Sequence, residues 1–295
     1  MIQSTLEEII TQDNLVHQGI FAQPEKQGSK ALLWVHGLTG KFYGDVLLMN
    51  MLAGACVTSG LGFASFNTRG HDMIANISTV DTNDPSGFGH KTIGAGYEKF
   101  EECIFDIDAA VTFLVNKGFS QVIVAGHSSG ANKVAYYAAE KNDDTRVSGV
   151  VLAGPMSDRL SPQNDKEEYE KNITMLKMLR DEGKGDALLT KANWFPATAD
   201  RTWSLIAPNT PEDVFNYGDA SHVLSVVSGI RAPLLVIFSG KDEYADRPIA
   251  DIKQVFDAHV SNKNYRSIII PDTTHGYERK EKEFVSEVVT WAASL

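Results

Sequence analysis

Short apolar runs rich in β-branched residues alternate along the chain with segments in which apolar residues recur every three or four positions. The runs have the length of strands. Several are apolar on both faces, which is typical of a parallel sheet covered by helices on both sides. The pattern predicts strands at 31–36, 62–67, 121–125, 147–153, 234–239 and 267–270. It therefore predicts an α/β fold with a mostly parallel central sheet flanked by helices.

Three stretches between or after these runs carry one apolar stripe each, at 100–114, 252–259 and 284–292. A stripe with helical spacing is typical of a helix that buries one face against a sheet. We interpret all three stripes as core faces and assign them no function.

The alternation of strands and helices stops between 157 and 230. This stretch is polar and helix-prone at 166–182 and then carries the aromatic residues Trp194, Phe195 and Trp203. A structureless loop of this length is uncommon inside a compact domain. We therefore predict a helical cap at 157–230, inserted into an α/β core formed by 1–156 and 231–295. The three aromatic residues line the substrate pocket in one interpretation and form the core of the cap in the other.

The predicted strand 121–125 continues directly into Gly126-His127-Ser128-Ser129-Gly130 and then into a helix. This is a G-x-S-x-G sequence in a strand–turn–helix setting, where a tight turn presents the serine hydroxyl at a helix N-terminus. Ser128 is therefore the candidate nucleophile. The alternative is a glycine-rich turn that contains a serine by chance.

A serine nucleophile needs a base, and the base needs an acid that orients it. His275 follows the predicted strand 267–270, and Asp242 follows the strand 234–239. Glu243 and Asp246 lie on the same loop and are alternative acids. We favour Asp242, because it lies nearest the strand end and has a short side chain.

Main-chain N–H groups must also stabilise the developing oxyanion. The N–H of Ser129, directly after the nucleophile, is one candidate donor. The second is the N–H of Leu38, in the His36-Gly37-Leu38 segment that follows the strand 31–36. His36 itself, like His71, has no metal-ligand or base-acid spacing around it, and we expect both to be structural.

These motifs, in this order, resemble the α/β-hydrolase superfamily over most of the chain. The blocks Asn67-Thr68-Arg69-Gly70-His71-Asp72 and Ser239-Gly240-Lys241-Asp242-Glu243-Tyr244 are similar to a narrower group of uncharacterised serine hydrolases and fungal siderophore-ester hydrolases. The chain differs from many relatives in having one residue, not two, between Gly240 and Asp242. It also carries a glycine-rich segment at 78–98, which we expect to border the substrate entrance.

The resemblance implies a serine esterase that hydrolyses a small-molecule carboxylic ester through an acyl-enzyme, without a metal or an organic cofactor. A thioesterase, an amidase or an acyltransferase with the same triad is the nearest alternative. A catalytically silent protein that binds a ligand on this fold is the alternative from another class.

The net charge and the cysteine content indicate which partners the protein is not expected to bind and in which compartment it is expected. The net charge is −11, from 27 Lys and Arg against 38 Asp and Glu, and would repel nucleic acids and anionic membranes. We predict that Cys56 and Cys103 are buried reduced thiols, since two cysteines do not make a secreted disulfide framework. The acidic start of the chain lacks a signal-peptide pattern. We therefore expect a cytoplasmic protein.

Overall fold

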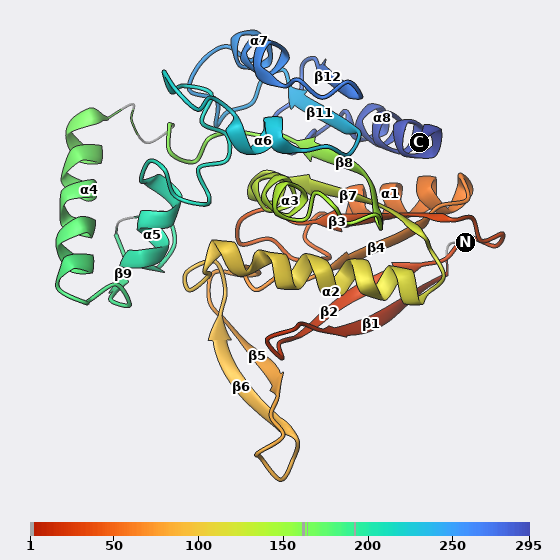
Figure 1. Ribbon diagram of the computed structural model, residues 1–295, viewed down its shortest axis with the longest axis horizontal. Coiled ribbons are helices and arrows are strands. Elements are labelled where there is room, and N and C mark those ends of the chain that lie inside the picture. Colours follow the sequence, from red (N-terminus) through yellow and green to blue (C-terminus); the bar gives the residue numbers. More distant parts are fainter. Residues whose placement is uncertain (1–2, 161–162, 164, 192) are drawn as a thin grey trace.

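An eight-stranded sheet forms the centre of the protein in this computed structural model, which describes residues 3–160, 163, 165–191 and 193–295 (Figure 1). Its strand order is β1-β2-β4-β3-β7-β8-β11-β12, and all neighbours from β4 to β12 are parallel. The strands are β1 (Ser4–Ile10), β2 (Val16–Ala22), β3 (Lys30–Val35), β4 (Gly62–Phe66), β7 (Gln121–His127), β8 (Val147–Ala153), β11 (Leu234–Ser239) and β12 (Tyr265–Ile270). The predicted fold class is thereby confirmed, and the six predicted strands correspond to the last six of these.

The two strands of this sheet that the sequence pattern did not predict, β1 and β2, are antiparallel and lie at one edge of the sheet. β1 is largely exposed, and its sequence places Glu7 and Glu8 between apolar residues. β2 is interrupted by His17 and Gly19. An antiparallel edge strand can face water on one side, so it does not need the continuous apolar run by which the other strands were found.

Helices cover both faces of this sheet (Figure 1). α1 and α8 bury Leu52 and Val288 on one face, whereas α2, α3 and α7 bury Ile107, Val134 and Phe256 on the other. The helices are α1 (Val46–Thr58), α2 (Cys103–Asn116), α3 (Ser129–Glu140), α7 (Ile249–His259) and α8 (Glu281–Ser294), with a 3₁₀ turn η1 (Phe100–Glu102) before α2. The predicted apolar stripes are the buried faces of α2, α7 and α8. None of the helices in the described part of the chain is long and apolar enough to cross a membrane.

Between β8 and β11 the chain forms a helical unit to one side of the layers (Figure 1). It consists of α4 (Lys166–Asp181), β9 (Leu188–Leu189), β10 (Ala197–Thr198) and α5 (Ala199–Ile206). Leu176, Phe195 and Leu205 bury their side chains together there, in a cluster separate from the two cores of the sheet. Farther along, Phe215, Leu224 and α6 (Ser225–Gly229) pack in the core beneath α3 and α7. Division of the chain at 157 and 230 stays a prediction.

A fully buried group of charges joins this cap to the core. Arg201 of α5 pairs with Glu98 and Glu212, and its Nε donates to the carbonyl oxygen of Ala95 at 2.9 Å. Lys133 of α3 pairs with the same Glu98 at 2.6 Å. Charges without access to water are tolerated only when they are paired and hydrogen-bonded, so this group constrains how the cap sits on the core.

A hairpin of β5 (Ala75–Val80) and β6 (Phe88–Ile93) projects beyond α2, at the bottom of the view in Figure 1. Ile77 and Ile93 pack with Leu15, and Phe88 near the tip of the hairpin is 58% exposed. This hairpin contains most of the segment that we expected beside the substrate entrance.

Candidate active site

Ser128 lies at the sharp turn between β7 and α3, with φ 56° and ψ −130°. Its main-chain N–H donates to the carbonyl oxygen of Ala153 at 2.9 Å, which ties the turn to β8. The chain packs so tightly that a Cβ on Gly126 would lie 2.1 Å from the carbonyl oxygen of Gly130, and a Cβ on Gly130 would lie 2.4 Å from that of Val35. The two glycines of the motif are therefore required by the close approach of backbone to backbone.

Asp242 and His275 follow the neighbouring strands β11 and β12, and their side chains meet. His275 Nδ1 lies 2.7 Å from Asp242 Oδ2, which also accepts a hydrogen bond from Ser239 Oγ at 2.7 Å. Oδ1 accepts the N–H of Tyr244 at 3.1 Å. Burial alone would raise the pKa of Asp242, but the hydrogen bond and charge of His275, with these other donors, hold that pKa below its usual value. Asp242 is thus kept as a carboxylate beside the imidazole.

The two alternative acids on this loop have other partners. Glu243 Oε2 accepts the main-chain N–H of His275 at 2.9 Å, so it holds the backbone of the loop and not the ring. Asp246 pairs with Arg247 at 2.7 Å. Of the three candidates, only Asp242 contacts the imidazole.

Three neighbours surround the ring of His275. Tyr244 stands edge-on to it with ring centroids 4.9 Å apart, and His127 lies 4.7 Å away. Burial and the charge of His275 lower the pKa of His127 to about 4, so neutral His127 donates from Nε2 to the carbonyl oxygen of His275 at 2.8 Å. Gly154, at φ 58°, leaves space for the ring, because a Cβ there would lie 3.0 Å from its Cε1.

His275 Nε2, the ring nitrogen that does not face Asp242, is buried and has no hydrogen-bond partner among the described residues. No hydrogen bond joins it to the Ser128 hydroxyl in this part of the chain. Catalytic hydrogen bonds are often long in a ligand-free site and tighten when substrate binds. The unpartnered nitrogen is therefore available to a proton donor inside the site.

The segment after β3 lies against the serine. A Cβ on Gly37 would be 3.0 Å from Ser128 Cβ, so the next N–H, that of Leu38, is close to the turn. Within the described residues, neither this N–H nor that of Ser129 donates a hydrogen bond. His36 orders the segment through Gly37 O at 2.9 Å and the N–H of Thr68 at 3.0 Å. Burial, followed by the charge of Lys133, lowers the pKa of His36 to about 3, so the ring is neutral and structural, as expected.

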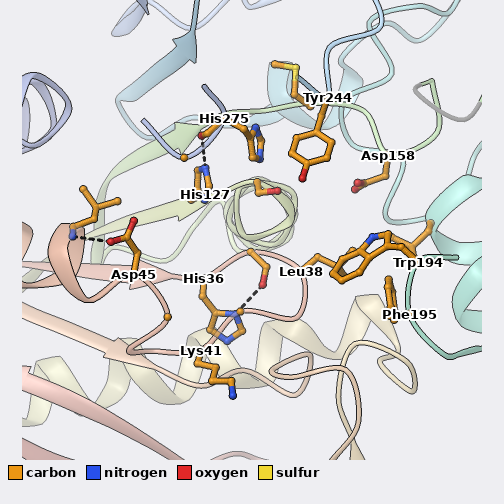
Figure 2. A pocket seen from close by; sticks show the side chains of 18 of the residues that line it. His36, Leu38, Lys41, Asp45, His127, Asp158, Trp194, Phe195, Tyr244 and His275 are labelled. Carbon is orange, nitrogen blue, oxygen red and sulfur yellow. Dashed lines mark hydrogen bonds between the residues drawn. The ribbon is translucent and has the colours of Figure 1, made fainter. Parts of the chain in front are cut away.

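A cavity of about 500 Å³ opens over Ser128 and His275 (Figure 2). Its walls come from the segment with Leu38, from α1, from the loop after β8 and from the cap. Most of the lining side chains that carry no charge are apolar or aromatic: Trp34, Leu38, Leu48, Met49, Met156, Trp194, Phe195, Leu205, Ile206 and Tyr244. Among the described residues, no group of three or more His, Cys, Asp or Glu side chains is arranged to hold a metal ion.

Two expectations about the cavity need correction. Trp203 does not line it: its indole packs in the cap cluster beneath the guanidinium of Arg180, 4.8 Å from the ring centroid. The α5 helix turns this side chain away from the opening, whereas Trp194 and Phe195 precede the helix and reach the cavity. The β5–β6 hairpin does not contribute a lining residue either, and in Figure 1 its tip points away from the sheet.

Sequence reasoning missed Asp158, Tyr244 and Lys41, all of which line the cavity. Asp158 and Tyr244 follow the carboxyl ends of β8 and β11, the edge of a parallel sheet where ligands bind. That position was the signal available for finding them. Lys41 pairs with Asp72 at 2.5 Å.

The arrangement matches solved structures of one fold. Siderophore hydrolase EstB from Aspergillus fumigatus superimposes with a TM-score of 0.69 at 18% identity, covering 98% of both chains. Alpha/beta hydrolase GrgF from Penicillium sp. sh18 gives 0.67 at 13% identity, covering 99% of this chain and all of the other. Est1E from Butyrivibrio proteoclasticus, bound to ferulic acid, gives 0.64 at 14% identity, covering 97% and 98%. These likenesses establish the α/β-hydrolase fold that the sequence motifs implied.

Sequence comparison then assigns the family. The model of the family described as "Protein of unknown function (DUF1749)" matches residues 78–293, so the chain belongs to that family. A search of curated proteins found no match.

Replacing Gly154 with alanine tests how the ring of His275 is accommodated. A left-handed alanine costs about 1–2 kcal/mol, and the added methyl would also press on the ring. Gly183→Ala is the matched control, because Gly183 has φ 71° and open space around its Cβ position. We expect both variants to lose stability in denaturant titrations, but only Gly154→Ala to move the NMR signals of the His275 ring. Unmoved ring signals, with equal stability losses, would contradict this account.

Proposed function

We propose that the protein is a serine hydrolase that cleaves carboxylic esters through an acyl-enzyme on Ser128. The observation that carries the proposal is a chain of three side chains that ends at one cavity: Ser128 and His275 line it, and Asp242 contacts His275 from behind. These are a serine in a turn with positive φ, a histidine whose Nε2 has no partner among the described residues, and a carboxylate 2.7 Å from its Nδ1. Ser128, His275 and Asp242 are the proposed triad.

In the first half of the reaction, Ser128 Oγ attacks the ester carbonyl while His275 Nε2 takes its proton. The carboxylate of Asp242 stabilises the imidazolium that forms. The N–H groups of Leu38 and Ser129 donate to the oxyanion of the tetrahedral intermediate. His275 then returns the proton to the leaving alcohol, and the acyl group stays on Ser128. Water attacks this acyl-enzyme by the same route and releases the acid.

The cavity supports a small-molecule ester as the substrate. Its apolar lining can enclose an acyl or alcohol chain, and Trp194 and Phe195 bring the cap into contact with that chain. Two of the structural relatives agree with this class of substrate, since one is named a siderophore hydrolase and another is bound to ferulic acid. Thioesters and amides present the same carbonyl chemistry, so the substrate panel below includes them.

Replacing Ser128 with alanine tests the nucleophile. We expect Ser128→Ala to lose nearly all hydrolysis of a panel of p-nitrophenyl esters, a thioester and an amide. About 10³-fold catalysis over water would remain from oxyanion binding. Ser129→Ala is the control, because it removes a neighbouring hydroxyl and keeps the main-chain N–H. If Ser129→Ala abolishes activity and Ser128→Ala does not, the nucleophile is wrongly assigned.

Changing each carboxylate to its amide tests the acid. Asp242→Asn keeps the shape but favours the wrong tautomer of His275, so kcat should fall by roughly 10⁴-fold, as in the serine-protease example. Glu243→Gln should stay within about tenfold, because its amide oxygen can still accept the N–H of His275. A large loss for Glu243→Gln beside a nearly active Asp242→Asn would transfer the role to Glu243.

A further inference from the structure

Asp158 is a carboxylate in the cavity that the proposed mechanism does not use. It follows β8 and lines the same cavity as Ser128, His275, Tyr244 and Trp194 (Figure 2). Its Oδ2 is buried and has no hydrogen-bond partner among the described residues. By contrast, Lys41 pairs with Asp72, and Asp45 caps α1 by accepting the N–H of Leu48 at 2.9 Å. The other two charged groups in the lining are thus already satisfied by the protein.

Among the described residues, the neighbouring charges leave Asp158 without a counterion of its own. The positive charges of Lys133 and Arg201 are paired with the negative charges of Glu98 and Glu212. These four groups form the buried contact between cap and core and have no net charge. Asp158 adds a negative charge next to this neutral group. A buried carboxylate in that position needs either a proton or a positively charged ligand.

The pKa of Asp158 reflects this excess of negative charge. Burial, followed by the negative charge of Glu212, raises the pKa of Asp158 to about 7. The charges of Arg201 and His275 act in the opposite direction and do not offset this effect. Near neutral pH, the site therefore exchanges a proton and can accept another cation in its place.

Aromatic surface in the cavity adds a second preference for a cation. Tyr244 is 56% exposed and Trp194 is 68% exposed, although both line the cavity. Exposed aromatic faces attract ammonium groups through their quadrupoles, and a neutral hydroxyl lacks this attraction.

We propose that the cavity binds substrates that carry a protonated amine, and that Asp158 is the specificity residue that holds this amine. Turnover of such amino esters rests on the hydrolysis proposed above, whereas binding of the amine does not. The Asp158 carboxylate accepts N–H donors from the ammonium, and the scissile carbonyl of the same molecule lies at Ser128.

The binding test uses the Ser128→Ala variant, so that catalysis plays no part, with calorimetric titration of n-pentylamine and 1-pentanol. We expect the amine to bind at least tenfold more tightly than the alcohol at pH 8. From pH 8 to pH 6 its affinity should fall roughly tenfold, because a carboxyl with a pKa near 7 goes from mostly ionised to mostly protonated.

Adding Asp158→Asn to this variant should lower amine affinity at pH 8 at least tenfold and change alcohol affinity less than threefold. Asp200→Asn is the control, because it removes a cap carboxylate that is 61% exposed and lies outside the cavity. It should leave both affinities unchanged. Wild-type protein at pH 5 provides a second comparison without any change at Asp158, and there amine and alcohol should bind alike.

Measurements of ester hydrolysis distinguish the proposed amine binding at Asp158 from the proposed serine hydrolase activity. The wild type should hydrolyse p-nitrophenyl 6-aminohexanoate, or a shorter ω-amino ester, more efficiently than the alkyl ester of equal length. Asp158→Asn should remove this preference by raising the KM of the amino ester. Asp158-dependent amine binding without hydrolysis of any ester would support this proposal and overturn the proposed function. Equal binding of amine and alcohol at pH 8, or unchanged amine affinity with Asp158→Asn, would overturn this proposal even if esters are hydrolysed.

Discussion

The arrangement of the site depends on the backbone at Ser128, whose φ of 56° and ψ of −130° form a sparsely populated conformation that costs about 1–3 kcal/mol. Contacts between the turn and its surroundings stabilise it: backbone atoms of Gly126 and Gly130 lie against each other, and β8 accepts the N–H of Ser128. The turn presents the hydroxyl at the carboxyl edge of the sheet. The loops after β11 and β12 carry Asp242 and His275 to the same edge. The turn that strains the backbone at Ser128 is thus also what brings the serine hydroxyl to the edge of the sheet where Asp242 and His275 lie.

One feature of the sequence, the apolar strands, allowed both the central sheet and the catalytic residues at its edge to be predicted. Strands covered on both faces are apolar throughout, so their ends can be located, and the residues that follow these ends must converge. Asp242 was distinguished from Glu243 by its distance from the strand end, and it is Asp242 that contacts the imidazole.

Other features depend on contacts that no local pattern reveals. The β5–β6 hairpin is held by contacts with the turn between β1 and β2, and its exposed strands have no apolar periodicity that would predict them. Trp194 and Trp203 are close together in the sequence, but the direction of α5 determines which of them reaches the cavity. The isolation of Asp158 becomes visible only when Lys133, from α3, and Arg201, from the cap, are seen to be already paired.

The central claim, that Ser128 is an activated nucleophile, is tested most directly by covalent trapping. The wild-type protein would be treated with a fluorophosphonate at neutral pH, digested, and analysed by mass spectrometry to locate the modified residue. Only a serine with a working base reacts quickly with this reagent. The account predicts one phosphonyl group per chain, on Ser128, with labelling much slower when His275 is replaced by alanine. A chain that remains unlabelled, or one labelled on another residue at the same rate in both proteins, would contradict it.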